Sequence, residues 1–246
     1  MKRILSISTG CFYSINKGYN RVMEMDGVIK LCSKMDVDGV EILFGNVAEL
    51  IKYKFKKETL DILRSMKFNT IHAPFYHQKK EDMIFSNKPI ARKALAKIYH
   101  AYDMINAKNI NFHPQQVKNF KIFDTINYQH SIENMEKHHN FDINYYNKIF
   151  KNNHSFKFVL DTTHSSEAGE LNKLFKVFNK KIIYCHLSAN YFNHLHLPLH
   201  VLNKEYLKQF NIIKKSRFPI VLENQTGTKT IGEYKKEVDF VRKWLN

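Results

Sequence analysis

The sequence predicts an α/β protein with a single (β/α)8 TIM barrel, and three observations lead to that prediction. The chain has 246 residues, close to the ~250 typical of this fold. Short apolar or β-branched runs alternate along it with longer segments whose apolar residues recur at helical spacing. Most of the short runs end at a histidine or a carboxylate. Because the carboxyl ends of barrel strands surround one axis, such a series predicts both the fold and the place of its chemistry.

The strand-like and helix-like segments follow one another as eight repeats, which favours a parallel barrel. An open doubly wound sheet is the rival architecture, but no glycine-rich phosphate-binding segment follows the first strand. Only about sixteen residues separate His113 from the next strand, so the fourth helix must be short or irregular. Strands are expected at 4–8, 39–44, 70–74, 109–113, 130–134, 156–161, 181–187 and 218–223, and helices at 20–35, 47–66, 89–105, 141–152, 168–178, 205–215 and 231–245.

The composition indicates one domain over 1–246, since no linker or low-complexity block divides the chain. No apolar stretch approaches the ~20 residues needed to cross a bilayer. Three cysteines, Cys11, Cys32 and Cys185, are far apart and odd in number, which argues against a disulfide framework and for a reducing compartment. We therefore expect a cytoplasmic enzyme without membrane association, and the sequence indicates no protein partner.

The charge is strongly basic, with 39 Lys and Arg against 23 Asp and Glu, a formal net charge of +16 and a pI near 9.6. Such a charge favours polyanionic partners such as nucleic acid. The basic residues are dispersed over helix-like stretches, however, and a general compositional bias explains them equally well. The charge thus favours a DNA substrate without deciding for one.

Metal-capable side chains stand at the ends of the third to eighth predicted strands. A single histidine after an apolar run is more often structural, but six such positions in order predict a metal site. Mixed imidazole and carboxylate ligands suit Zn²⁺ or Mn²⁺ better than Ca²⁺ or Mg²⁺. The six residues are His72, His113, Glu133, Asp161, His186 and Glu223, and three further histidines that could hold another ion are His164, His194 and His196. Most of the remaining histidines are expected at the surface or in packing: His77, His100, His130, His138, His139, His154 and His200.

The segments HAP, FHP, IEN, LDTTH, CHLS, HLP and VLEN occur in this order along the chain. In order and spacing they resemble the xylose isomerase-like TIM barrels. That superfamily contains the endonuclease IV-type AP endonucleases (AP endonuclease family 2) and many sugar isomerases and epimerases. The resemblance covers essentially the whole chain, and it is more specific for the superfamily than for either branch.

The endonuclease IV branch of the resemblance implies up to three zinc ions and abasic DNA as the partner. His72 and His113 would bind the first ion, and Glu133 would bridge to the second. Gln115 departs from the glycine usual after the FHP segment, and the stretch from His186 to His196 is short. Further ligands implied are Asp161, His186 and Glu223 for the second ion and His164 and His196 for the third, with His194 where that family has an aspartate. Phe75 and Tyr76 fall where that family inserts side chains into DNA, or they are packing aromatics at the barrel mouth.

The isomerase branch implies one Mn²⁺-type ion held by a subset of these residues, with a sugar or sugar phosphate as substrate. Glu133 and Glu223 would then exchange a proton with the carbons flanking a carbonyl. His164 and His196 would bind sugar hydroxyls or phosphate. Glu41 would line the pocket in either scheme, or else make structural hydrogen bonds. The four ligands implied are Glu133, Asp161, His186 and Glu223.

Charge is a physical criterion for choosing between the two schemes. Three carboxylates with one divalent ion leave the site at about −1, whereas three ions leave about +3, which suits a phosphodiester. We therefore expect metal-dependent phosphodiester hydrolysis at abasic sites in DNA, with Glu133, Glu223 and His164 taking part in the chemistry. The alternative is a sugar or sugar-phosphate isomerase or epimerase, and a non-catalytic nucleic-acid-binding barrel also remains open.

Overall fold

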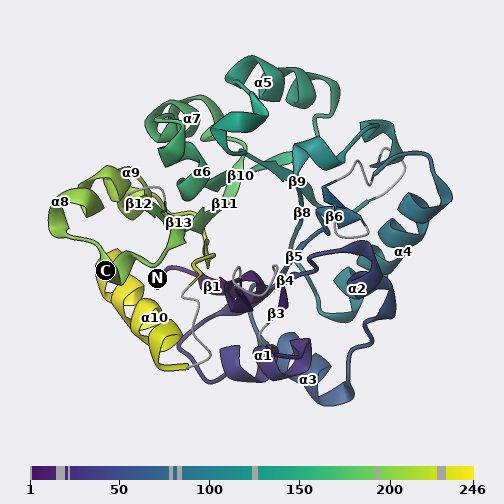
Figure 1. Ribbon diagram of the computed structural model, residues 1–246, viewed down its shortest axis with the longest axis horizontal. Helices are drawn as coiled ribbons and strands as arrows, with labels where there is room; N and C mark the ends of the chain where they lie inside the picture. Colours follow the sequence, from purple (N-terminus) through teal and green to yellow (C-terminus); the bar gives the residue numbers. More distant parts are fainter. Residues whose placement is uncertain are drawn as a thin grey trace.

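The computed structural model describes residues 2–14, 20–21, 23–77, 80–81, 85–123, 127–191, 194–225 and 231–246. Eight parallel strands close into a barrel in which each strand pairs with the next one in sequence and the last pairs with the first (Figure 1). This confirms the predicted fold class. The strands are β1 (Leu5–Ser8), β4 (Gly39–Leu43), β5 (Thr70–His72), β8 (Ile110–Phe112), β9 (His130–Glu133), β10 (Lys157–Asp161), β11 (Ile182–Leu187) and β14 (Ile220–Leu222).

Helices form the outer ring around these strands (Figure 1). The fourth repeat has only the 3-10 turns Pro114–Gln116 and Phe120–Phe123 among its described residues, as its short length predicted. The helices are α1 (Met25–Cys32), α2 (Val47–Lys52), α3 (Lys57–Ser65), α4 (Pro89–Met104), α5 (Ile143–Asn152), α6 (Thr162–Glu167), α7 (Leu171–Phe178), α8 (Lys204–Leu207), α9 (Asn211–Lys215) and α10 (Ile231–Leu245). No helix in these described ranges is long and apolar enough to cross a membrane.

Two of the predicted helices are interrupted in the structure. The expected helix 47–66 is two helices, because the chain is extended at Tyr53 (φ −67°, ψ 135°). There the ring of Tyr53 lies 4.8 Å from that of Phe55, and its hydroxyl donates to Asp26. Burial of these aromatic rings stabilises the break. The expected helix 205–215 is likewise divided, by the 3-10 turn Lys208–Phe210 between α8 and α9.

Alternation along the strands separates an apolar outer layer from a barrel interior that holds polar side chains as well as the apolar Val159 and Val221. On β4, Val40 and Ile42 belong to the core shared with the helices, whereas Glu41 points the other way. Inside the barrel, Tyr184 donates a hydrogen bond of 3.1 Å to Glu41. His186 follows two residues after Tyr184 on β11, so its side chain shares the interior face. Strand periodicity therefore places polar groups on the barrel axis.

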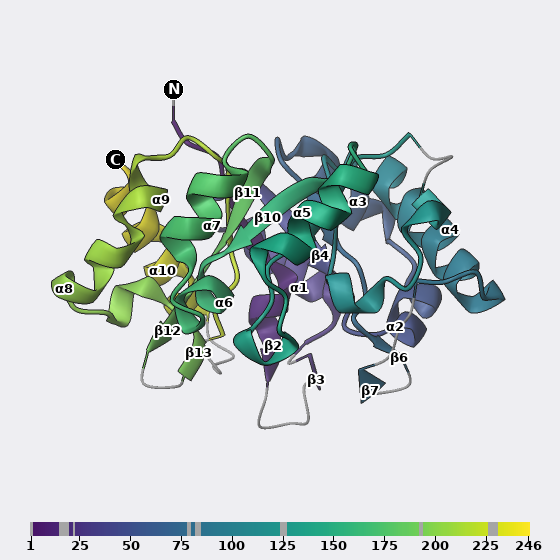
Figure 2. The ribbon, with the colours of Figure 1, turned by 90° about the horizontal axis from the view of Figure 1, so that it is seen from above.

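Three short hairpins lie on one side of the barrel, opposite the two termini (Figure 2). They follow β1, β5 and β11, so they stand at the carboxyl ends of the strands. The hairpins are β2 (Tyr13–Ser14) with β3 (Asn20–Arg21), β6 (Tyr76–His77) with β7 (Lys80–Glu81), and β12 (Ala189–Tyr191) with β13 (His194–Leu197). They border the barrel mouth at which the predicted site residues arrive.

Candidate metal centre

The carboxyl ends of six neighbouring strands bring the six strand-end residues into one cluster at the barrel mouth. Their side chains are buried, the most exposed being His113 at 13% and Glu223 at 12%. Among the described residues, three groups have candidate ligand atoms within 4.8 Å of one another. These groups are His72, His113 and Glu133; Glu41, His186 and Glu223; and Asp161, His196 and Glu223.

The carboxylate of Glu133 stands between two sets of imidazoles. Its Oε1 lies 2.7 Å from Nε2 of His113 and 3.7 Å from Nε2 of His72. Its Oε2 lies 2.9 Å from Nδ1 of His186 and accepts a 2.6 Å hydrogen bond from Nδ2 of Asn111. Each oxygen of one carboxylate therefore faces a different group of nitrogen atoms. A carboxylate so placed is suited to bridge two metal ions.

The imidazoles of His72 and His186 are each oriented by a hydrogen bond at the ring nitrogen that does not face Glu133. Nδ1 of His72 lies 2.9 Å from the carbonyl oxygen of Ala73, so Nδ1 donates and Nε2 keeps its lone pair. That Nε2 is buried and has no hydrogen-bond partner among the described residues. Nε2 of His186 lies 3.2 Å from Glu41, which leaves Nδ1 facing Glu133 and Glu223. Partners of this kind orient the histidine ligands of metal sites.

Asp161 and Glu223 complete the side of the cluster that faces His186. Oε2 of Glu223 lies 3.1 Å from Nδ1 of His186, and Oδ2 of Asp161 lies 3.9 Å from it. Asp161 also begins α6, because its Oδ1 accepts from the backbone N–H of His164 at 2.7 Å. Its Oδ2 is buried without a hydrogen-bond partner within the described part of the chain. The unpartnered atoms and the mixed donor set fit a metal with nitrogen and oxygen ligands.

The three further histidines that could hold another ion, His164, His194 and His196, differ in their positions. His164 and His196 stand at the edge of the cluster, with ring centroids 5.3 Å apart. His194 has an exposed side chain and belongs to none of the three ligand groups. Residues two positions apart on a strand, as His194 and His196 are, present their side chains on one face. His196 instead has a φ of 55°, which interrupts the extended geometry between them.

The buried charges strongly perturb the titration of the cluster. Burial would lower the pKa of His72, but the nearby carboxylates of Glu133, Glu41 and Glu223 raise it to about 9. Burial raises the pKa of Asp161 to about 6 against the opposing charges of His164 and His196. Burial would also raise the pKa of Glu133, yet the charges of His113 and His186 hold that pKa well below its usual value. A cation placed among these carboxylates would replace the protons on the imidazoles.

A cavity of about 330 Å³ opens above the cluster. Phe75, 8% exposed, forms part of its wall and stacks on His113 with ring centroids 5.0 Å apart. The side chain of Tyr76 lies outside the described residues. Glu41 does not line the cavity; it accepts hydrogen bonds from Thr70 and Tyr184 beneath His186. The lining residues are Leu43, His72, Phe75, His113, Gln115, Glu133, Met135, Glu136, His138, His139, His164, Leu195, His196, Glu223 and Gln225.

Three lining residues with metal-capable side chains were not predicted from the sequence as site residues. Glu136 does not stand at a strand end, and His138 and His139 are among the histidines expected at the surface or in packing, whereas all three line the cavity. They belong to the loop and 3-10 turn directly after β9, so the run ENMEKHH behind Glu133 was the available signal. By contrast, His130 packs against Phe156 as expected, and burial lowers its pKa to about 4.

Sequence comparison finds no matching family model and no matching curated protein. Solved structures do match over the full chain. One is a D-tagatose 3-epimerase-like protein, with a TM-score of 0.64 and 15% identity over 100% of this chain and 97% of that one. Another is endonuclease IV from Thermus thermophilus, with a TM-score of 0.60 and 13% identity over 99% and 98%. A third is D-allulose 3-epimerase from Methylomonas sp., with 0.62 and 13% over 99% of both chains.

These similarities define the class of protein by its fold. The chain shares the TIM-barrel fold of these proteins over its full length, so the resemblance seen in the sequence is confirmed at the level of the fold. Both an endonuclease and sugar epimerases are among the neighbours, at 11 to 15% identity. At this identity the neighbours show the fold of the chain and not its reaction.

Proposed function

We propose that this protein is a metal-dependent enzyme that hydrolyses phosphodiester bonds, with DNA containing abasic sites as its substrate. The observation that carries the proposal is the two-sided placement of Glu133. His72 and His113 face its Oε1, while His186 faces its Oε2. A single ion needs only the side with His186, Asp161 and Glu223. The buried Nε2 of His72 supports a second ion on the other side.

The protein's own groups would act in this site as ligands and as supports for ligands. Bound zinc ions would supply positive charge to the phosphodiester and acidify a water molecule. Glu133 would hold the two ligand sets in one fixed relation. Glu41 would keep Nδ1 of His186 available, because it accepts from Nε2. His164, which lines the cavity, would help to hold a further ion, which would stabilise charge on the departing side of the substrate.

Charge and similarity support DNA as the substrate class. The net charge of +16 favours association with a polyanion. The wall residue Phe75 offers an aromatic face beside His113, and aromatic faces stack on bases or fill the gap left by a missing base. Endonuclease IV from Thermus thermophilus shares the fold over nearly the whole chain.

A sugar or sugar-phosphate epimerase or isomerase is the second candidate, because one specific arrangement favours it. Glu133 and Glu223 both approach Nδ1 of His186, at 2.9 and 3.1 Å, so one ion could lie between two carboxylates. Two such carboxylates can exchange protons with a bound carbonyl compound. A cavity of about 330 Å³ also suits a small ligand.

An incision assay tests the proposal against this alternative. Protein stripped with chelator and reloaded with zinc is incubated with a duplex carrying a synthetic abasic site, beside the same duplex without it. We expect incision at the abasic site only with zinc, and its loss in His72→Asn. His154→Asn is the control, since His154 is exposed and lies outside the cluster. Absence of incision, together with solvent deuterium exchange into a ketose, would establish the epimerase instead.

A further inference from the structure

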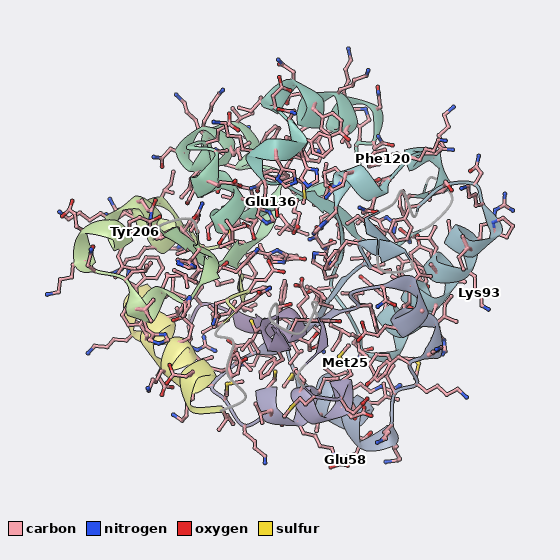
Figure 3. All side chains as sticks on the ribbon, in the orientation of Figure 1. Met25, Glu58, Lys93, Phe120, Glu136 and Tyr206 are labelled. Carbon is pink, nitrogen blue, oxygen red and sulfur yellow. The ribbon has the colours of Figure 1, made fainter. Side chains whose placement is uncertain are left out.

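A second cluster of ligand-type side chains stands at the wall of the cavity beside the six strand-end residues. We name it the outer cluster; it consists of Glu136, His164 and His196. Glu136 lies in the loop after β9, and Figure 3 shows it near the barrel axis. His164 belongs to α6 and His196 to β13. All three line the cavity.

Both imidazoles of the outer cluster keep one nitrogen for a ligand. Nδ1 of His164 lies 2.8 Å from the carbonyl oxygen of Asn134, and Nδ1 of His196 lies 3.0 Å from that of Glu223. Each Nδ1 therefore donates to the backbone, which leaves the lone pair on Nε2. Backbone carbonyls orient metal-binding histidines in this way.

The spacing between Glu136 and His164 matches that of two ligands on one ion. Oε1 of Glu136 lies 3.3 Å from Nε2 of His164. With zinc bonds of about 2.0–2.2 Å in a tetrahedral site, neighbouring ligand atoms lie about 3.3–3.5 Å apart. The other oxygen, Oε2, lies 3.7 Å from Nε2 of His139 and is buried without a hydrogen-bond partner among the described residues. His164 is only 4% exposed and Glu136 20%, so the pair is largely shielded from solvent.

We propose that Glu136 is the carboxylate ligand of an outer metal ion that it binds together with His164 and His196. The inference rests on the proposed multi-ion function and assigns the outer ion's carboxylate to the loop after β9. His194, which the sequence placed in this role, has an exposed side chain. The ion would be a divalent transition metal of the zinc type, because two imidazoles and one carboxylate form the donor set.

Counting the bound metal ions tests the inference independently of catalysis. Chelator-stripped protein is dialysed against buffered zinc, and the zinc bound per chain is measured by native mass spectrometry. We expect Glu136→Gln to bind one ion fewer than the wild type, and His194→Ala to bind as many as the wild type. The matched control is Glu205→Gln, which makes the same charge change at an exposed residue of α8 that does not line the cavity. Thermal unfolding of each metal-free variant checks that the fold is retained.

The results separate this inference from the proposed function. If Glu136→Gln and the wild type bind equal amounts of zinc, or if His194→Ala loses an ion, the assignment of Glu136 is wrong whatever the incision assay shows. If Glu136→Gln loses an ion and abasic DNA is not cut, the assignment stands and the proposed reaction fails.

Discussion

At the scale of single residues, buried partners decide what each ligand can do. Glu41 was considered from the sequence as a pocket residue or a structural one, and the structure places it beneath His186, where it also accepts from Thr70 and Tyr184. These three hydrogen bonds account for the burial of the Glu41 carboxylate, which does not line the cavity. Its contribution to the site would pass through the orientation of one imidazole.

Substitution of Glu41 tests this indirect role. Glu41→Ala removes the acceptor for Nε2 of His186 and is expected to weaken zinc binding by about 10- to 100-fold. Glu41→Gln keeps an acceptor oxygen and should retain most of the affinity. Zinc competition with a chromophoric chelator measures both. Equal losses in the two variants would show that charge, and not orientation, is what Glu41 supplies.

The pH dependence of stability tests a second buried residue, His130. Burial lowers its pKa to about 4, below the ordinary 6.5, so the folded state binds fewer protons than the unfolded state. Above pH 6.5 the imidazole is neutral in both the folded and the unfolded state, so its burial carries no pH-dependent penalty. As the pH falls from 6.5 toward 4, the unfolded state takes up a proton that the folded state does not, and the free energy of unfolding decreases. Between pH 7 and pH 4.5 we expect His130→Phe to gain about 2–3 kcal/mol relative to the wild type.

Urea denaturation of metal-free protein at several pH values measures this difference. The aromatic replacement suits the neighbouring ring of Phe156, 5.5 Å away, although Tyr99 loses its partner at every pH. The loss of the Tyr99 contact is the same at every pH, so it does not change how the stability difference between the two proteins varies with pH. A stability difference that stays constant across this range would contradict the account of His130.

At the scale of elements, α10 holds the segment that follows the β12–β13 hairpin. Glu237 of α10 is fully buried and accepts from the backbone N–H groups of Leu199 and His200, at 2.7 and 2.9 Å. It also lies 2.8 Å from Nδ1 of His200. These bonds fix the chain three residues beyond His196. The hairpin is therefore anchored to the barrel from the far end of the sequence.

Removal of this anchor should cost stability. Glu237→Ala leaves two backbone donors without their acceptor, and we expect the free energy of unfolding to fall by about 2–4 kcal/mol. The control Asp239→Ala removes an exposed partner of Lys235 on the same helix and should change stability little. Chemical denaturation of both variants measures the difference. Equal effects would mean that the buried contacts of Glu237 do not anchor the hairpin.

The elements also show how far the sequence predicts the structure. Periodicity located all eight strands, because each has a buried run bounded by polar residues. It did not locate the break at Tyr53, since that break depends on the ring contact of Tyr53 with Phe55 and on its hydrogen bond to Asp26, far away in the sequence. Strand ends identified the cluster around Glu133, because parallel strands converge. Glu136 and His139 were missed, since a loop's direction is set by contacts such as that of Glu136 with His164.

At the scale of the whole molecule, the barrel gathers buried carboxylates and imidazoles at one mouth of a strongly basic protein. The outer surface carries the positive charge, whereas the axis carries Glu41, Glu133, Asp161 and Glu223. Metal ions are the natural complement of these acids. A multi-ion site would also reverse the charge of the mouth and suit it to a phosphate.

Anomalous X-ray scattering at the zinc absorption edge tests the central claim, that Glu133 stands between two ions. Crystals of zinc-loaded protein should show one peak beside His72 and His113 and another beside His186, Asp161 and Glu223. A single peak next to His186, with His72 and His113 bare, would contradict the account and leave the one-ion sugar enzyme as the better explanation.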